Sequence, residues 1–403
     1  MMASRHSSWS RLLRLGLLGG LLTSPAISAG ELSNTRYQLQ GFAAQGLVGS
    51  TNHNFFGESR DGVSTEFTEA GLNGIWQPLD ALRLSGQVVY RRAGESDQDG
   101  LRLDYAQADW TFLRSEATQL GLKLGKVKLP YGLYNETRDM PYTRPGILLP
   151  QSVYVDNSRD LLLAAPGFFV HGSSIQRYGA TEYSIGWVKP NFDSDSVEYT
   201  FLGNTRPGKL DGQSAIGARI RWDMPSETTL MLTYADAKAD YVPGSLDPFA
   251  AGNIRFRNVL ATLQQRLDTV TLTAEYGEPR LDIRNIHPQL NTQRTVQAFY
   301  LQGEWRFQPD WELMLRYDTF YRDKNDKSGR KFQAATFGTF PAHSMYAHDW
   351  TLGLRWDATP NLMLRAEYHH IDGTAWLPGP DNPNLFGREQ RWNMWLLQAA
   401  YRF

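Results

Sequence analysis

Two adjacent histidines near the C-terminus are the first residues that suggest chemistry. The run His369-His370-Ile371-Asp372 offers imidazole and carboxylate groups, which bind metal ions or act as general bases. Neighbouring residues of a strand face opposite ways, so only one of the two histidines can enter a given site. The sequence has no HExxH motif and no other histidine at a supporting spacing. We therefore expect no metal site, and we place these histidines at an interior face or a rim.

Two other short motifs fall short of known sites. Ser173 and Ser174 follow His171-Gly172, but no G-x-S-x-G nucleophile elbow occurs. The run from Asp323 to Lys327 resembles a fragment of a calcium loop, yet it lacks the glycine and the distal glutamate of that motif. The chain has no cysteine, which excludes thiol nucleophiles and Cys-ligated metals. We expect no enzyme and no cofactor.

Composition narrows the class of protein. The 403 residues include 41 Lys+Arg and 42 Asp+Glu, for a net charge of −1. This balance does not favour a nucleic-acid partner, because such proteins carry a clustered basic surplus. A mean hydropathy of −0.45 excludes a bundle of transmembrane helices. It leaves open a membrane β-barrel, in which only alternate strand residues need be apolar.

The N-terminus has the pattern of an export signal. Arg5, Arg11 and Arg14 precede the apolar run 15–22, and small residues follow up to Ala29. A basic segment, a short apolar segment and small residues are typical of a secretory signal peptide, and the run is too short to span a membrane. We predict a signal peptide over residues 1–29.

The residue pattern in the rest of the chain predicts β-strands. From Thr35 onward, polar and apolar residues alternate over segments of about ten residues. Leu82, Leu84 and Val88, for example, lie on the face opposite Arg83 and Ser85. The same split recurs near 229–234, 270–276, 312–318 and 362–369. This period of two predicts sheets that are wetted on one side only.

Aromatic residues are sorted along these strands. A Trp precedes each of four short turns, and the strand after each turn ends in a Tyr. The tryptophans are Trp76, Trp222, Trp305 and Trp356, and the tyrosines are Tyr90, Tyr234, Tyr317 and Tyr368. Two rings of aromatics are expected where a barrel meets the two membrane interfaces. A soluble β-sandwich alternates too, but it has no reason to sort aromatics by height.

The connections give a strand count. Short turns are expected near 77–80, 113–118, 178–181, 223–228, 267–269, 307–310 and 357–361, and long loops near 49–63, 93–99, 129–166, 190–213, 238–252, 283–292, 323–345 and 372–388. Seven short turns alternating with eight long loops join sixteen strands, and outer-membrane barrels have even strand numbers with short periplasmic turns. The sequence thus predicts an all-β, 16-stranded antiparallel transmembrane β-barrel over residues 30–403.

Three segments do not fit the simple pattern of sixteen alternating strands. Residues 197–202 look strand-like, but counting them would put the 223–228 turn on the wrong side, so we assign them to structure within the fourth loop. In 253–266 the parity of Ile254 conflicts with that of Val259, and a β-bulge would reconcile the two. Strict alternation would point Lys126 and Lys128 at lipid, so we place both beyond the lipid band, where the strand enters the third loop.

The C-terminal strand carries a family resemblance. Trp395, Leu397, Ala399, Tyr401 and Phe403 alternate on one face and end in a terminal Phe. This ending resembles the signature that the barrel assembly machinery recognises, here in Tyr401 and Phe403. The whole pattern resembles Gram-negative outer-membrane porins, and 125–136 is similar to a stretch of phosphate-selective O/P-like porins. The resemblance implies an outer-membrane location, contact with lipid and lipopolysaccharide, and a homotrimer.

The third loop, 129–166, is the longest, and the resemblance to porins implies that it folds into the lumen. Cations and tyrosines in and beside it suit a constriction. The expected constriction residues are Lys126, Lys128, Tyr131, Tyr134, Arg138, Tyr142, Arg144 and Arg159.

The same alternation predicts which strand residues line the pore. On the strands where alternation separates an inner from an outer face, the inner positions hold ten basic and five acidic residues. The basic ones are Arg83, Arg91, Lys123, Arg219, Arg221, Arg306, Arg316, Arg355, Arg365 and Arg402, and the acidic ones are Asp109, Glu275, Glu304, Asp318 and Glu367. Sixteen strands enclose an aqueous channel, and a basic wall concentrates anions.

Three functions from different classes remain open. The first is a diffusion porin for small hydrophilic solutes, preferentially anions. The second is a barrel-borne hydrolase, although the outer faces that we can phase show no Ser/His pair. The third is an adhesion or structural barrel with a plugged lumen. Conductance in a planar bilayer separates the first from the other two.

Overall fold

The computed structural model describes residues 36–403 except 98–99, 193, 204–205 and 385–386. The predicted signal peptide lies outside the described residues. Alternating sequence segments become strands, with the bounds β1 Tyr37–Ser50, β2 Ser64–Leu79, β3 Leu82–Ala93, β4 Gly100–Arg114, β5 Thr118–Lys128, β6 Ala164–Gln176, β7 Gly179–Val188, β8 Lys209–Asp223, β9 Thr228–Val242, β10 Gly252–Arg266, β11 Val270–Gly277, β12 Arg280–Arg284, β13 Thr292–Thr295, β14 Gln297–Gln308, β15 Trp311–Tyr321, β16 Tyr346–Asp357, β17 Leu362–Gly373 and β18 Arg391–Arg402.

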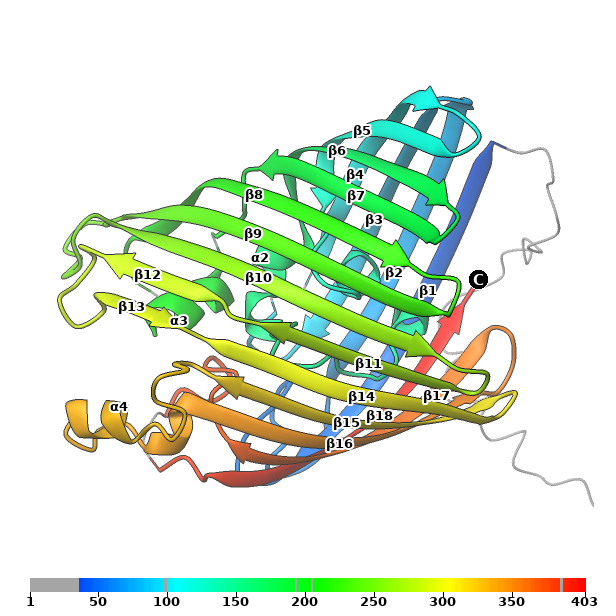
Figure 1. The fold of residues 1–403 in the computed structure, drawn as a ribbon. Coiled ribbons are helices and arrows are strands. Elements are labelled where there is room, and N and C mark those ends of the chain that lie inside the picture. The colour runs from blue at the N-terminus through cyan, green and yellow to red at the C-terminus, as the bar shows by residue number, and fades with distance from the viewer. Residues whose placement is uncertain (1–35, 98–99, 193, 204–205, 385–386) are drawn as a thin grey trace, which may run out of the picture. The chain divides into compact units, whose positions relative to one another are not determined.

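These strands form one closed antiparallel sheet (Figure 1). β11 and β12 both pair with β10, so they are two parts of one barrel strand. β13 and β14 pair with β12 and β11 in the same way. The sheet closes where β1 pairs with β18, from Phe42 opposite Arg402 to Ser50 opposite Met394. The barrel therefore has sixteen strands, as the sequence predicts.

Short turns and long loops alternate as expected. Each of the seven predicted short turns joins two neighbouring strands at the end of the barrel where the C-terminus lies (Figure 1). The long connections lie at the other end. The short helices are confined to them: η1 Asn135–Thr137, η2 Pro141–Thr143, η3 Asp156–Ser158, α2 Arg159–Leu163, α3 Asp195–Leu202, α4 Arg330–Ala335 and η4 Ala342–Met345. Within the described residues, no helix has the length and apolarity needed to span a bilayer.

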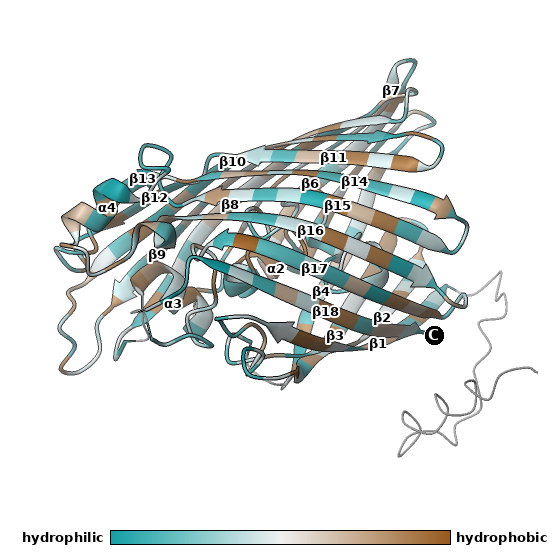
Figure 2. Cartoon of the chain, turned by 90° about the horizontal axis from the view of Figure 1, so that it is seen from below, coloured by the Kyte–Doolittle hydropathy of each residue, from teal (hydrophilic) through white to brown (hydrophobic). Residues whose placement is uncertain are grey.

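The outer wall carries the apolar face of each strand, and the colours alternate along the strands (Figure 2). Trp76, Trp222, Trp305 and Trp356 are each 38 to 51% exposed and lie near the short turns. Tyr234 and Tyr368 are exposed nearer the opposite end, where Tyr90 and Tyr317 are half-buried. The sorting of aromatics by height is therefore present in three dimensions.

The segment 253–266 corrects one prediction. β10 pairs with β9 without a register shift from Gly252 to Gln265, so no bulge is present. Ile254 points inward and is buried beside α3, whereas Val259 faces outward. The parity conflict arises because an apolar cluster lies inside the barrel at the long-loop end, where loop 4 folds inward. Residues 197–202 belong to α3 within that loop, as expected.

Candidate functional site

The third loop, 129–163, folds into the barrel and is held by carboxylates of the wall. Glu367 on β17 accepts hydrogen bonds from the backbone amides of Ile147 and Leu148, at 2.5 and 3.1 Å. Asp318 on β15 accepts from the Ser152 amide at 3.1 Å. A loop that leaves the sheet has unpaired amides, and burying them without acceptors would be costly. The inward acids supply those acceptors.

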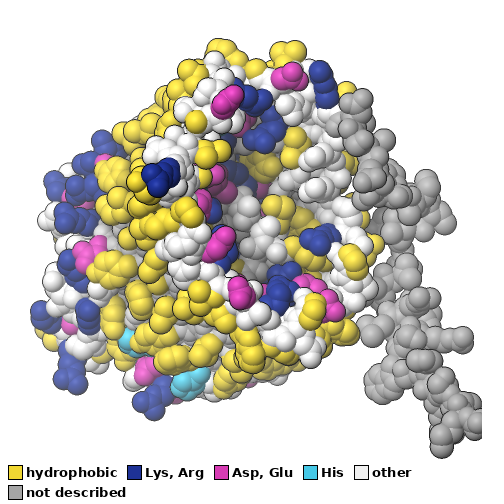
Figure 3. Space-filling model, turned by 45° about the vertical axis from the view of Figure 1, so that its right-hand side comes forward, with side chains coloured by type: hydrophobic (Ala, Val, Ile, Leu, Met, Phe, Trp, Pro, Cys, Tyr) yellow, Lys and Arg dark blue, Asp and Glu magenta, His cyan; other side chains and the backbone are white. Residues whose placement is uncertain are grey.

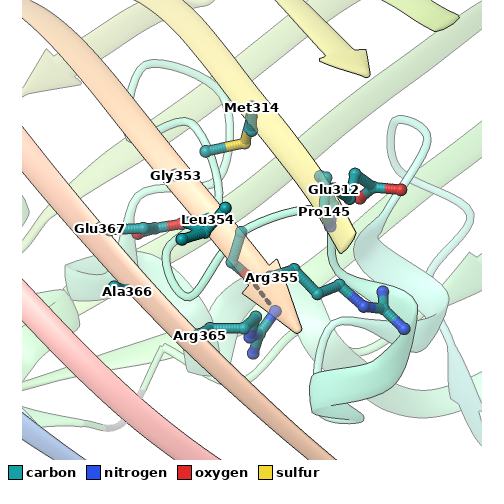
Figure 4. A pocket seen from close by; sticks show the side chains of 10 residues that line it. Pro145, Glu312, Met314, Gly353, Leu354, Arg355, Arg365, Ala366 and Glu367 are labelled. Atoms are coloured by element: carbon teal, nitrogen blue, oxygen red, sulfur yellow. Dashed lines mark hydrogen bonds between the residues drawn. The ribbon is translucent and has the colours of Figure 1, made fainter. Parts of the chain in front are cut away.

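Two wall arginines bind the carbonyls of the same loop. Arg365 donates to the carbonyl oxygens of Gly146 and Arg144, at 2.5 and 3.2 Å. Arg316 donates to the Leu148 carbonyl at 3.0 Å. Figure 4 shows Arg365 beneath the loop, in a small pocket lined by Pro145 and the wall. Acids and arginines on β15 and β17 thus clamp both kinds of backbone group at the loop tip.

A buried ionic network ties the start and end of the loop to β2–β5. Lys128 lies between Asp104 and Asp139, 2.6 Å from each. Arg159 also pairs with Asp139, and Arg144 reaches Glu69 at 2.6 Å. These side chains are at most 8% exposed. Each charge has an opposite partner, which is the condition for burying it.

Arg138 and Arg91 belong to the same network. Arg138 donates to the Tyr154 carbonyl at 3.0 Å and lies 3.4 Å from Asp156. Burial and the nearby Arg159 lower the pKa of Arg138 to about 10. Arg91 on β3 contacts Glu69 and Asp156, at 3.4 and 3.3 Å. Asp156 therefore links the loop to the wall through two arginines.

The loop tyrosines are also packed against the wall. Tyr131 and Tyr134 are 6 and 8% exposed, in an apolar cluster with Tyr154 and Tyr300. The Tyr154 hydroxyl donates to Glu275 at 2.5 Å. Nearer the short turns, the Tyr142 hydroxyl lies 2.6 Å from the carbonyls of Asn361 and Ala400.

The predicted constriction residues are thus brought together, but not as a water-lined filter. Lys128, Tyr131, Tyr134, Arg138, Arg144 and Arg159 are buried between the loop and the wall. Lys126 is a correction of a different kind. It lies within β5 on the outer face and donates to the Leu103 carbonyl at 2.6 Å. Both lysines belong to the end of β5, just before the loop begins, and only Lys128 has its side chain buried between the loop and the wall.

The predicted wall residues point inward but divide into two groups. Arg91, Arg316, Asp318, Arg365 and Glu367 are covered and at most 5% exposed. Arg83, Lys123, Arg219, Arg221 and Arg355 stay partly exposed. In an oblique view with the short-turn end turned forward, charged side chains of both signs lie around the recessed part of the surface (Figure 3). The exposed group lies mainly on β3–β8, away from the loop tip.

The histidine and serine motifs form no catalytic arrangement. His369 faces inward and contacts Asp349 and Glu367, at 2.8 and 3.2 Å, whereas His370 faces outward and contacts Asn393. His171 contacts Asp109 at 2.8 Å, and no hydrogen bond joins it to a serine hydroxyl in the described part of the chain. In the same described part of the chain, no group of three or more His, Asp or Glu side chains has an arrangement that could hold a metal ion.

Sequence reasoning missed several inward acids, among them Glu69 and Glu182 as well as Asp104 and Asp349. Glu69 lies in β2, where inward Phe67 and Ile75 obscure the alternation. Counting back from Trp76, which faces lipid, would have placed Glu69 on the inner face, because the two positions differ by an odd number. Glu182 is opposite Arg221 across β7 and β8 and is exposed to the lumen.

Comparison with known proteins agrees with this architecture. Residues 188–399, just over half of the chain, match a family described as putative beta-barrel porin-2, OmpL-like. No curated protein matches the sequence. Solved structures with a similar fold include OmpT of Vibrio cholerae, the outer membrane channel DcaP of Acinetobacter baumannii and OmpF of Salmonella typhi in complex with daunomycin. Their identities to this chain are 11, 12 and 14%, with TM-scores of 0.57, 0.56 and 0.56, and each alignment covers 91% of this chain and 97% of the other.

Proposed function

Because the chain belongs to the putative beta-barrel porin-2, OmpL-like family, we propose that it is a passive outer-membrane channel for small hydrophilic solutes that prefers anions. The channel role and the outer-membrane location follow from the family and the closed sixteen-stranded barrel. One observation supports the anion preference. The third loop covers most of the inward acids that we phased and leaves most of the inward bases accessible.

The exposed fractions of the wall residues carry this argument. Glu275, Asp318 and Glu367 are 1, 2 and 4% exposed, because the loop uses them as backbone acceptors. The side chains of Arg83 and Arg221 are 52 and 27% exposed.

The accessible half of the wall, on β3–β8, keeps a basic excess. Its basic residues are Arg83, Lys123, Arg219 and Arg221, and its exposed or half-exposed acids are Glu182 and Asp223. A narrow channel with low-dielectric walls amplifies such a bias and raises the local concentration of anions. Neutral hydrophilic solutes would pass by diffusion.

A planar bilayer with a salt gradient tests the proposal. Wild-type protein should give discrete conductance steps. The sign of its reversal potential should show that anions cross more readily than cations. The variant Arg83→Gln/Arg219→Gln/Arg221→Gln should move that potential towards zero. The matched control Arg280→Gln/Arg284→Gln/Arg391→Gln removes three exposed arginines of the outer face and should leave the reversal potential unchanged. Cation preference of the wild type would refute the anion assignment, and an absence of steps would refute the channel.

One observation favours a second candidate, a closed adhesion or structural barrel. Phe55 and Phe56 of loop 1, Ile147 and Leu148 of loop 3 and Trp376 of loop 8 form one apolar cluster inside the long-loop end. A barrel whose loops are joined in this way would not conduct at rest. The same bilayer recording discriminates between the two, because this candidate gives no steps in the wild type and steps after loop 8 is shortened.

A homotrimer is also part of the proposal. The outer face of β1 and β2 differs from the remaining wall, because it carries small or polar residues such as Gln45, Thr68 and Ala70. Thr68 donates to the Gln45 side-chain carbonyl at 2.8 Å. Polar groups facing hydrocarbon are costly, so this face suits contact with another copy. Because the chain has no cysteine, Ala70→Cys should crosslink copies, whereas Leu232→Cys on the opposite wall should not.

Assembly by the barrel machinery completes the proposal. Tyr401 and Phe403 are 50 and 63% exposed on the outer face, with ring centroids 6.5 Å apart. They end β18, the strand that closes the barrel against β1. A recognition signal on this strand would be accessible until closure. Deleting Phe403 should reduce the yield of folded barrel in the outer membrane.

A further inference from the structure

Three arginines come together at the long-loop end from separate parts of the chain. Arg294 in β13 lies opposite Leu281, which is buried inside the barrel, so Arg294 points inward as well. Arg322 directly follows β15. A backbone hydrogen bond from the Lys324 amide to the Thr295 carbonyl, at 2.8 Å, holds the start of loop 7 beside β13. Arg294 and Arg322 are therefore neighbours at the inner edge of the barrel mouth.

Arg322 attaches loop 8, which joins β17 to β18, to this edge. Its Nε and Nη2 atoms both donate to the Ala375 carbonyl, at 3.0 and 2.6 Å. Arg388 of the same loop donates to the Asn382 carbonyl at 2.6 Å and is close enough to Arg322 to repel it. Arg294, Arg322 and Arg388 are each half-buried, and we call them the mouth arginines.

The mouth arginines have no anionic partner in the part of the chain that the structure describes. No carboxylate oxygen there lies within 4.0 Å of them. Asp323 acts on Arg294 from farther away, and its carboxylate accepts from the Asn325 amide at 2.9 Å. The Arg294 Nε atom is buried and donates to no acceptor among the described residues. Arg144, by contrast, pairs with a buried carboxylate.

This excess of positive charge is costly without a counter-ion. Burial, together with the charges of Arg294 and Arg388, lowers the pKa of Arg322 to about 9, in loop 7 outside the membrane. A guanidinium keeps its proton at neutral pH, so three positive charges remain at one place. Carbonyl oxygens give these groups dipoles but no opposing charge. A partly buried charge without a partner destabilises the protein, and an added anion would relieve that cost.

Loop 8 also ties the other external loops together. Asp381 accepts from the backbone amides of Gly57 in loop 1 and Glu95 in loop 2, at 3.1 and 3.0 Å. Gly379 lies against the Tyr199 ring of α3 in loop 4, where a Cβ would overlap that ring. Loop 8 thus contacts three other loops, and the two hydrogen bonds from Arg322 fasten it to the wall.

We propose that the mouth arginines bind a small solute with a dianionic group, and that this solute takes Arg322 from the Ala375 carbonyl and releases loop 8. An oxyanion accepts from a guanidinium more strongly than a neutral carbonyl does, because it adds an opposing charge. The planar guanidinium matches two oxygens of a carboxylate or a phosphate at once. Ala375 precedes Trp376, which belongs to the apolar cluster of loops 1, 3 and 8. Releasing this segment loosens the cluster, so the solute opens its own entrance.

This inference rests on the proposed channel. The solute favours the open mouth because Arg322 is free to bind it only when Ala375 is released. Planar bilayers with the full-length protein test this, with succinate, glycerol 3-phosphate and neutral glycerol as probes. The open probability of wild type should rise about tenfold with at least one dianion, and the probe that acts identifies the head group. Glycerol should have no effect.

Two variants should act in opposite directions. Arg294→Gln/Arg388→Gln removes charge from the site and should lose the response to the dianion. Arg322→Gln takes two hydrogen bonds from the Ala375 carbonyl and should raise the open probability in the absence of any probe. The control Arg280→Gln/Arg284→Gln removes two exposed arginines of the outer face and should respond as wild type does. A general loss of stability would move both variants in the same direction.

The inference is overturned if neither dianion acts on wild type or if glycerol acts equally. A wild-type response in Arg294→Gln/Arg388→Gln would also overturn it, as would an unchanged resting open probability in Arg322→Gln. Binding of each probe to the full-length protein is measured separately by native mass spectrometry. Conductance steps without dianion binding would refute this inference alone. Dianion binding without any steps would instead refute the proposed channel, and with it the opening of the mouth.

Discussion

Glu367 on β17 accepts two hydrogen bonds from consecutive backbone amides, those of Ile147 and Leu148, at the tip of the third loop. The same carboxylate contacts His369 on its own strand at 3.2 Å. One wall residue therefore holds the segment that occupies the lumen. An inward acid that parity assigns to the pore wall instead acts as an anchor.

Removing this anchor should open the lumen. In Glu367→Ala two buried amides lose their acceptor, at a cost of about 1–3 kcal/mol each. We expect a larger and noisier single-channel conductance. Glu367→Gln keeps one side-chain carbonyl and should fall between Glu367→Ala and wild type. Glu182→Ala, on the accessible wall, should keep wild-type noise. Identical traces for Glu367→Ala and wild type would show that the loop is held by other contacts.

A substitution of Arg144 tests whether this residue anchors the third loop or selects ions in the channel. It lies 2.6 Å from Glu69 and is 4% exposed. Arg144→Gln should lower the free energy of unfolding by about 3 kcal/mol, because a buried carboxylate loses a partner. The reversal potential should keep its sign and size, since this guanidinium does not face the channel water. Urea unfolding followed by bilayer recording measures both. A large loss of anion preference at unchanged stability would restore Arg144 as a filter residue.

Acid should weaken the contact between the wall and the second long loop, which joins β3 to β4. Burial alone would raise the pKa of Asp97, but the guanidinium groups of Arg91 and Arg102 outweigh it and lower that pKa to about 2. A carboxyl with a lowered folded pKa stabilises the protein above its unfolded value of 3.8, and this contribution of about 2 kcal/mol is lost as pH falls through 2. The stability difference between wild type and Asp97→Asn should therefore be full at pH 5 and shrink towards pH 2. A difference independent of pH over this range would contradict the assignment.

Closure of the barrel between β1 and β18 requires space for the aromatic ring of the C-terminal residue, Phe403. A Cβ at Gly41 would meet the ring of Phe403, whereas a Cβ at Gly74 meets only Leu39, at 3.9 Å. Gly41→Ala should destabilise the barrel by about 1–2 kcal/mol through this overlap. Gly74→Ala is the matched control and should be nearly neutral. Electrophoretic mobility of unheated and heated samples reports the folded fraction, and equal melting of the two variants would show that Phe403 moves aside freely.

Periodicity alone was enough to predict most of the barrel. Alternation between Leu82 and Tyr90 places those side chains correctly, because a closed sheet with lipid outside must repeat every two residues. The same rule failed at Ile254, which is apolar yet points inward above the membrane, against α3. Local pattern cannot tell burial by lipid from burial by an internal loop.

Local alternation alone predicts the strand number, the turns, the aromatic rings and the inward orientation of Arg316, Asp318, Arg365 and Glu367, because each strand carries this pattern in its own residues. Which of those inward charges meet water cannot be predicted in this way. That depends on where the third loop lies, and its position is set by long-range pairs such as Arg144 with Glu69, whose partners are far apart in the chain and follow no period.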